Sequence, residues 1–181
     1  MIYISGKGGV GKSFLSKKIC EIDKERECLN LDQFIVDHFD SCFEIYKESK
    51  EEKFRCLKID FIKKIKSFFE NEEKKYLIEG TIKDKQLVID LFEGFQYKFL
   101  YVRPESEKLY KESIRRRFKE DLKENKKTLG FVWNQIDPKN EEESFEEKID
   151  QIVEMEFQKV DEYENFYTGI KFERVYNNFQ N

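Results

Sequence analysis

The sequence predicts an α/β fold with a doubly wound, mostly parallel five-stranded sheet in three layers. Short apolar runs alternate along the chain with longer amphipathic segments, which is typical of strands that alternate with helices. A glycine-rich loop also joins the first apolar run directly to the first amphipathic segment. Because strands joined by helical crossovers pair in parallel, helices are expected on both faces of the sheet.

The expected strands are short apolar runs that end at charged or turn-forming residues. They are expected at 2–4, 28–31, 76–78, 98–102 and 172–176. The second run ends at Asp32 and the third ends at Glu79. Since parallel strands end at one edge of a sheet, both carboxylates are expected beside the glycine-rich loop.

The expected helices carry apolar residues at intervals of three and four, which places these residues on one buried face. Such intervals occur at 15–22, 59–69, 86–92, 110–122 and 145–167. The segment 33–58 is mixed in character and predicts only short helical pieces.

The composition predicts one globular domain that spans residues 1–181. The 34 Lys and Arg residues nearly balance the 38 Asp and Glu residues, so the net charge is only -4. This balance argues against a protein that wraps nucleic acid, because binding many phosphates requires an excess of basic residues. No stretch is apolar and long enough to predict a membrane span, and the first strand leaves no room for a signal peptide. We therefore expect a cytoplasmic protein with neither a nucleic-acid nor a membrane partner.

The cysteines do not predict a metal site. None of the four is paired in a Cys-x-x-Cys motif, and the chain contains a single histidine, whereas structural zinc requires clustered ligands. We expect all four cysteines to be reduced thiols.

The glycine-rich loop, Gly6 to Ser13, reads Gly-Lys-Gly-Gly-Val-Gly-Lys-Ser and satisfies the pattern G-x-x-x-x-G-K-[ST]. Glycines allow successive backbone amides to surround an anion, and the helix that follows adds its positive N-terminal dipole. Lys12 is expected to reach the β- and γ-phosphates of ATP, and the Ser13 hydroxyl to bind Mg²⁺. The predicted nucleotide-binding residues are Gly8, Gly9, Val10, Gly11, Lys12, Ser13 and Phe14.

The loop sequence from Lys7 to Ser13 resembles that of the chromosome-partitioning and septum-positioning ATPases. In that family a lysine near the start of the loop acts across a dimer, which would be the role of Lys7. Residues 134–137, Asn-Gln-Ile-Asp, are similar to their late strand and its base-reading asparagine. These ATPases, however, carry an Asp-x-x-Pro or Asp-x-x-Gly turn after the third strand, where this chain has Glu79-Gly80-Thr81. Otherwise Lys7 is expected to be an exposed loop lysine.

The rest of the chain resembles the small P-loop kinases, the group that includes uridine kinase, dephospho-CoA kinase and nucleoside monophosphate kinases. Three segments carry the resemblance: residues 29–34 around Asp32, residues 77–80 around Glu79, and the arginine-rich residues 115–121. The resemblance implies ATP and Mg²⁺ as cofactors, a helical acceptor-binding insert near 33–72 and a lid near 104–130. Glu120 departs from the pattern, because it stands where those kinases have the arginine of an Arg-Asp pair.

The catalytic candidates are Lys12, Asp32, Arg116 and Arg117. Asp32 would orient the acceptor hydroxyl or hold a magnesium-bound water, unless it only caps the next turn. The metal-site candidates are Ser13, Asp32 and Glu79. Arg115, Arg116 and Arg117 cannot all face one way on a helix, so one or two would close over the phosphate and the others would pair on the helix surface.

Three residues remain open between two interpretations. Arg103 would either contact the nucleotide or simply end its strand. Trp133 and Asn134 would either line an adenine pocket or belong to the core and a turn.

The first functional hypothesis is a monomeric or homodimeric kinase that transfers the γ-phosphate of ATP to a small nucleoside, nucleotide or related metabolite. The second is a nucleotide-switched ATPase or GTPase of the partitioning type that dimerises. The third is a non-catalytic nucleotide-binding interaction module. The sequence does not identify the acceptor or choose between ATP and GTP.

Overall fold

A computed structural model describes residues 1–69, 73–123 and 145–177. The sheet has five parallel strands in the order β2-β3-β1-β4-β5. Its strands are β1 (Ile2–Ser5), β2 (Arg26–Asn30), β3 (Lys75–Glu79), β4 (Lys98–Pro104) and β5 (Glu173–Asn177). The predicted α/β fold with a parallel five-stranded sheet is therefore confirmed.

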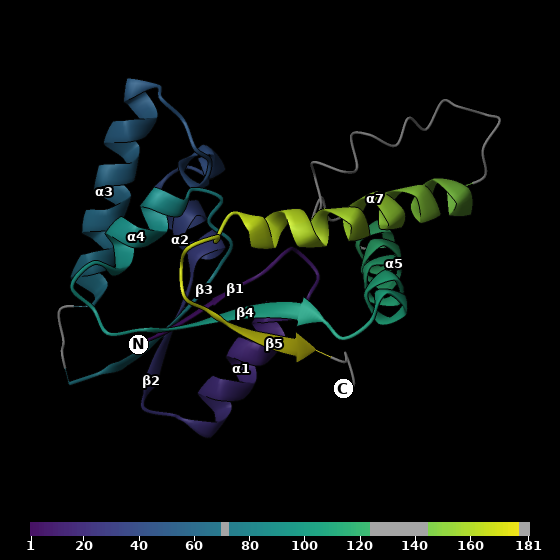
Figure 1. The fold of residues 1–181 in the computed structure, drawn as a ribbon, viewed down its shortest axis with the longest axis horizontal. Helices are drawn as coiled ribbons and strands as arrows, with labels where there is room; N and C mark the ends of the chain where they lie inside the picture. Colours follow the sequence, from purple (N-terminus) through teal and green to yellow (C-terminus); the bar gives the residue numbers. More distant parts are fainter. Residues whose placement is uncertain (70–72, 124–144, 178–181) are drawn as a thin grey trace.

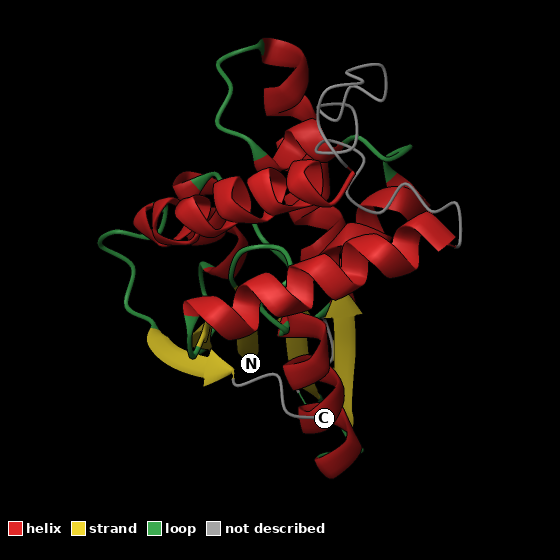
Figure 2. Ribbon diagram, turned by 90° about the vertical axis from the view of Figure 1, so that its right-hand side faces the viewer, coloured by secondary structure: helices red, strands yellow, loops and turns green. Residues whose placement is uncertain are grey.

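Helices cover both faces of this sheet (Figure 1). The described helices are α1 (Lys12–Ile22), α2 (Leu31–His38), α3 (Glu52–Phe68), α4 (Lys85–Phe92), α5 (Glu107–Lys123) and α7 (Phe145–Asn165), with a 3₁₀ turn η1 at Phe43–Tyr46. In the side view of Figure 2, the strands lie partly behind the helices. Among the described residues, no helix is both long and apolar enough to cross a membrane.

Alternating side chains of the central strand divide the core into two clusters. Tyr3 packs in the cluster that contains the apolar faces of α2, α3 and α4. Its neighbour Ile4 points to the opposite face, where α1 packs. Through Val10, this second cluster continues to α5 and α7, which pack against each other beyond the loop. The loop therefore lies where the sheet, α1 and the α5–α7 pair meet.

The segment around Asp32 differs from the sequence-based expectation. The predicted strand 28–31 is wrong at its end, because β2 ends at Asn30 and α2 begins at Leu31. Asn30 caps this helix by accepting a hydrogen bond from the Gln33 amide, 2.9 Å away. Leu31, Phe34 and Ile35 then bury one face of α2. Asp32 consequently lies in the first turn of a helix instead of at a strand end.

The segment 33–58 is more regular than predicted, since α3 begins at Glu52, seven residues before the expected start. The expectation of four reduced thiols is also wrong: Cys20, near the end of α1, forms a disulfide with Cys28 of β2. The chain reverses between these two elements and brings the two cysteines together, although their spacing matches no short cysteine motif. Cys42 and Cys56 are free.

Candidate functional site

The glycine-rich loop connects β1 to α1, and α1 begins at Lys12. Gly9 and Gly11 have φ values of 84° and 90°, in the left-handed region that favours glycine. A Cβ atom on Gly11 would collide with the Asn177 side chain, whose Nδ2 donates a hydrogen bond to the Val10 carbonyl over 3.0 Å. The Tyr110 hydroxyl donates to the Gly8 carbonyl over 3.1 Å. The end of β5 and helix α5 therefore hold the loop in its shape.

The second half of the loop faces the end of β3. The Ser13 hydroxyl donates a hydrogen bond to Glu79 Oε1 over 2.5 Å. The other oxygen of Glu79 lies 3.5 Å from the Nδ2 atom of Asn30, at the end of β2. Glu79 is 7% exposed, so its carboxylate is held by partners from two neighbouring elements. The structure thus brings together two of the predicted metal-site residues, Ser13 and Glu79.

Lys12 lies among charged groups of both signs. Burial lowers the pKa of its ammonium from 10.5 to about 8. The carboxylates of Glu79 and Asp32 oppose this shift, whereas the guanidinium of Arg117 adds to it. The Lys12 Nζ atom donates to the Lys7 carbonyl over 3.2 Å. A buried ammonium at the N-terminus of a helix is an environment that an anion would stabilise.

Asp32 reaches the same site from α2. Its side chain is accessible to solvent, yet the surrounding protein desolvates the carboxylate and raises its pKa, while the Lys12 ammonium lowers it.

Tyr46 was not among the predicted site residues. Burial and the nearby Asp32 charge raise the pKa of its phenol, and its hydroxyl has no hydrogen-bond partner within the described part of the chain. An unpaired buried hydroxyl next to a carboxylate is a group that a ligand could satisfy.

Lys7 is not the exposed loop residue that the sequence predicted. Its side chain is 3% exposed and forms an ion pair with Glu156 of α7, which is 10% exposed. Burial lowers the pKa of the Lys7 ammonium, and the Glu156 carboxylate only partly offsets this shift. Burial alone would raise the pKa of Glu156, but the positive charges of Lys7 and Lys159 outweigh it, so the pKa of Glu156 is lowered. Glu156 lies 149 residues from Lys7, so no local pattern connects them.

The three arginines of α5 diverge, as helix geometry predicts. Arg115 pairs with Asp150 of α7. Arg116 is exposed and lines a surface cavity together with Glu112 and Lys119. Arg117 lies near enough to Lys12 for its charge to lower the pKa of the Lys12 ammonium further. The structure therefore brings Arg117 to the loop and places Arg116 on another face of α5.

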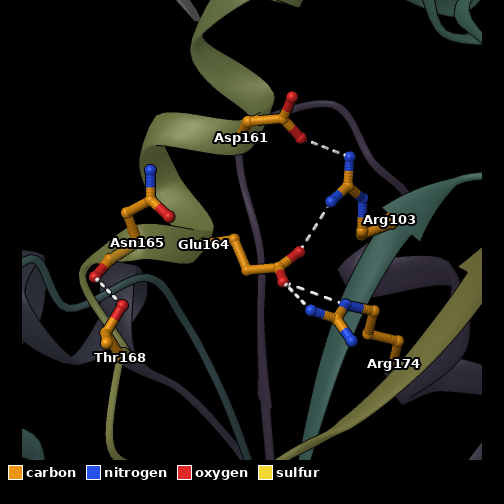
Figure 3. Close-up of polar contacts among 6 residues, drawn as sticks. All are labelled: Arg103, Asp161, Glu164, Asn165, Thr168 and Arg174. Carbon is orange, nitrogen blue, oxygen red and sulfur yellow. Dashed lines mark hydrogen bonds and ion pairs between the residues drawn. The ribbon is translucent and has the colours of Figure 1, made fainter.

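Arg103 anchors α7 to the sheet. At the end of β4, its guanidinium binds Glu164 over 2.8 Å and Asp161 over 2.5 Å (Figure 3). Glu164 also accepts from Arg174 of β5 over 2.5 Å. These contacts favour the interpretation in which Arg103 is structural, and they position α7 relative to the loop. Trp133 and Asn134 lie outside the described residues, and so does the part of the predicted lid beyond residue 123.

Phe14 and the two central glycines complete the predicted nucleotide-binding set. Phe14 is 41% exposed at the start of α1, with the Lys18 Nζ atom 5.6 Å from its ring centroid. Gly8 has open space where a Cβ would be, whereas a Cβ on Gly9 would collide with Ile114 of α5. Packing against α5 and a left-handed φ therefore require glycine at position 9, whereas position 8 leaves open space beside the backbone.

The residues present fit ATP with Mg²⁺. Left-handed glycines, the free N-terminus of α1 and the Lys12 ammonium suit a chain of phosphates. Within the described residues, no cluster of three or more His, Cys, Asp or Glu side chains could hold a metal by itself. Mg²⁺ does not require such a cluster, because it keeps several waters and shares its remaining positions between few side chains and phosphate oxygens.

A strand, a loop of the sequence G-x-x-x-x-G-K-S and a helix, placed at the carboxyl edge of a parallel sheet, define the P-loop class of fold. Shikimate kinase from Bacteroides thetaiotaomicron is a similar solved structure, with a TM-score of 0.55 and 16% identity over 98% of this chain and 84% of that one. At this identity the similarity shows the shared fold alone.

A second solved structure, of an uncharacterized protein from Eubacterium ventriosum, is 12% identical over 98% of this chain and 88% of its own, with a TM-score of 0.48. No protein-family model matches the chain. No curated protein matches it at a significant level. The narrower resemblance to uridine kinase and dephospho-CoA kinase stays a prediction.

Proposed function

We propose that the protein is an ATP-dependent phosphotransferase that moves the γ-phosphate of ATP to a hydroxyl group of a small metabolite, such as a nucleoside or nucleotide. The observation that carries this proposal is the meeting of Lys12, the Ser13–Glu79 pair and Asp32 at one edge of the sheet. Phosphoryl transfer depends mainly on positioning and charge neutralisation, and these residues supply both.

Each residue has a role in this proposal. Lys12 and the loop amides bind the phosphates, and Ser13 and Glu79 hold Mg²⁺, Glu79 through water. The metal neutralises charge on the transferred phosphate when it is bound. Asp32 orients the acceptor hydroxyl toward the γ-phosphate and accepts its proton as the hydroxyl oxygen bonds to phosphorus and ADP leaves. Arg117 approaches from α5 and stabilises negative charge on the transferred group.

The partitioning-type alternative receives less support. In that hypothesis Lys7 would act on a nucleotide bound to a second subunit. Here Lys7 is buried against Glu156 of its own chain, and releasing it would leave this buried carboxylate paired with Lys159 alone. The kinase fold of the similar solved structure points in the same direction.

The proposal is tested by incubating the purified protein with ATP, Mg²⁺ and a panel of nucleosides, nucleotides and coenzyme precursors. ATP consumption that requires an acceptor is expected. Asp32→Asn should then lower kcat about 100-fold or more and leave ATP affinity nearly unchanged, because general-base contributions are of this size. Asp37→Asn, on an exposed turn of the same helix, is the matched control and should change neither quantity.

Other outcomes would contradict the proposal in distinct ways. Acceptor-independent hydrolysis together with ATP-dependent dimerisation would support the partitioning-type hypothesis. Tight ATP binding without turnover on any acceptor would support the interaction module.

A further inference from the structure

Two lysine ammonium groups lie near one aromatic ring of α7, and a third lysine lies one turn before that ring on the same helix. The Lys83 Nζ atom lies 4.1 Å from the ring centroid of Tyr163, and the Lys7 Nζ atom lies 5.2 Å from the same centroid. Lys159 reaches Glu156 Oε1 over 3.1 Å. Glu156, Lys159 and Tyr163 follow one another at intervals of three and four, so they share one face of α7. We call Lys7, Lys83, Lys159, Glu156 and Tyr163 the lysine cluster.

The lysine cluster has more positive than negative charge. Its three ammonium groups face a single carboxylate, that of Glu156. Lys47 also acts on Lys83, but it pairs with Glu44 over 2.6 Å, and Glu162 adds a further carboxylate, so an excess of one positive charge remains. Burial lowers the pKa of Lys83, and Lys47 and Lys159 lower it further. Partly buried like charges repel one another, and an anion placed among them would relieve this repulsion.

The backbone around Lys83 is held in place without any ligand. The Lys83 amide donates to the Tyr46 carbonyl over 2.8 Å. The preceding residue, Ile82, accepts a hydrogen bond from the Tyr167 hydroxyl over 2.8 Å, and the Thr81 hydroxyl donates to the Gly6 carbonyl over 2.5 Å. The Arg103–Glu164 contact fixes the end of α7 that carries Tyr163 (Figure 3). The backbone of Lys83 and the end of α7 are thus both positioned before a ligand binds, which lowers the entropic cost of binding.

We propose that the lysine cluster binds a carboxylate or phosphate group of the acceptor, with Lys83 and Lys159 as its cationic ligands and the Tyr163 ring as a wall. The assignment of this anion to the acceptor rests on the proposed function. Tyr46 links the two regions, because its carbonyl binds Lys83 while its unpaired hydroxyl lies near Asp32. The acceptor hydroxyl would lie at Asp32 and its anionic group at Lys83.

The test uses three probes that share a polyol skeleton: glycerol, glycerate and glycerol 3-phosphate. Each is titrated by NMR into the full chain saturated with ADP and Mg²⁺, so that the loop is already occupied. At least one anionic probe should bind about tenfold or more tightly than glycerol, which is the effect of one good charge-assisted contact. Lys83→Gln and Lys159→Gln should each remove most of this preference.

The exposed Lys63→Gln on α3 is the matched control and should keep the preference. The melting temperature of each variant verifies that it is folded. If one of the two variants does not fold, the other still tests the inference. The inference is overturned if neither anion binds more tightly than glycerol, or if the preference survives in both Lys83→Gln and Lys159→Gln. Probe binding needs no turnover, so anion selectivity without any ATP consumption would contradict only the proposed function. Phosphorylation of neutral acceptors without anion selectivity would contradict only the anion site.

Discussion

The two halves of the phosphate loop contain one lysine each, and these lysines lie in different surroundings. Lys7, in the first half, is buried and paired with Glu156 of α7. Lys12, in the second half, lies near the carboxylates of Glu79 and Asp32, but neither neutralises it in a direct ion pair that is seen among the described residues. The first lysine therefore joins the loop to the rest of the protein, and the second is available to a ligand. Changes at the two positions should consequently affect different properties.

The largest expected effect is on stability, at the first half of the loop. Glu156→Ala leaves the Lys7 ammonium buried without its carboxylate, which should cost about 3 kcal/mol. For a chain of this length, that corresponds to a fall of roughly 10 °C in melting temperature, measured by calorimetry. Glu154→Ala, which breaks a surface pair with Lys111, should lower it by only about 1–2 °C. An unchanged melting temperature for Glu156→Ala would mean that the Lys7 pair does not support the fold.

The lid arginine is expected to have the next largest effect, on turnover. Arg117→Ala should lower kcat about 100-fold, since removing one preorganised donor from a developing charge has an effect of this order. Arg116→Ala is the matched control, because Arg116 lies on another face of α5, and it should retain kcat within about twofold. Equal losses in steady-state assays of both variants would refute the assignment of Arg117.

Lys12→Ala should weaken ATP binding about 100-fold, as expected for loss of a charged contact to the phosphates. Isothermal calorimetry measures this affinity, and Lys17→Ala on the exposed side of α1 is its control. Removal of the Lys12 charge should leave the unliganded protein as stable as before, in contrast to Glu156→Ala. Unchanged ATP affinity would remove the phosphate assignment altogether.

The smallest expected effect concerns pH. Only the protonated Lys12 attracts phosphate, and its pKa in the unliganded protein is about 8. Affinity should therefore fall about tenfold between pH 7 and pH 9 as the ammonium loses its proton. The measurement uses ADP without Mg²⁺, so that metal binding does not contribute. A flat profile over this range would show that burial does not lower the pKa of Lys12.

Much of the fold could be predicted because it depends on local patterns. The strand–loop–helix unit from Ile2 to Ile22 agrees with expectation, since apolar periodicity and glycine positions specify it within a short stretch. The end of β2 was predicted less accurately than this unit. Leu29 and Leu31 suit a strand or a helix equally, and only the Asn30 cap and the burial of α2 against the core decide between them.

The candidate site shows the same division. The motif identified Lys12 and Ser13, and the ends of apolar runs identified Asp32 and Glu79. Neither the hydrogen bond from Ser13 to Glu79 nor the choice of Arg117 among three adjacent arginines was predictable, because each depends on the packing of separate elements.

The sequence by itself determined that a strand, a glycine-rich loop and a helix open a parallel α/β sheet, because this information lies in residue types and spacings within a few turns of chain. The tertiary structure alone decided that Lys7 is buried, that Glu156 is its partner and that Lys83 lies against the Tyr163 ring. Such charge pairs form between residues far apart in the chain, and the path of α7 across the loop brings them together.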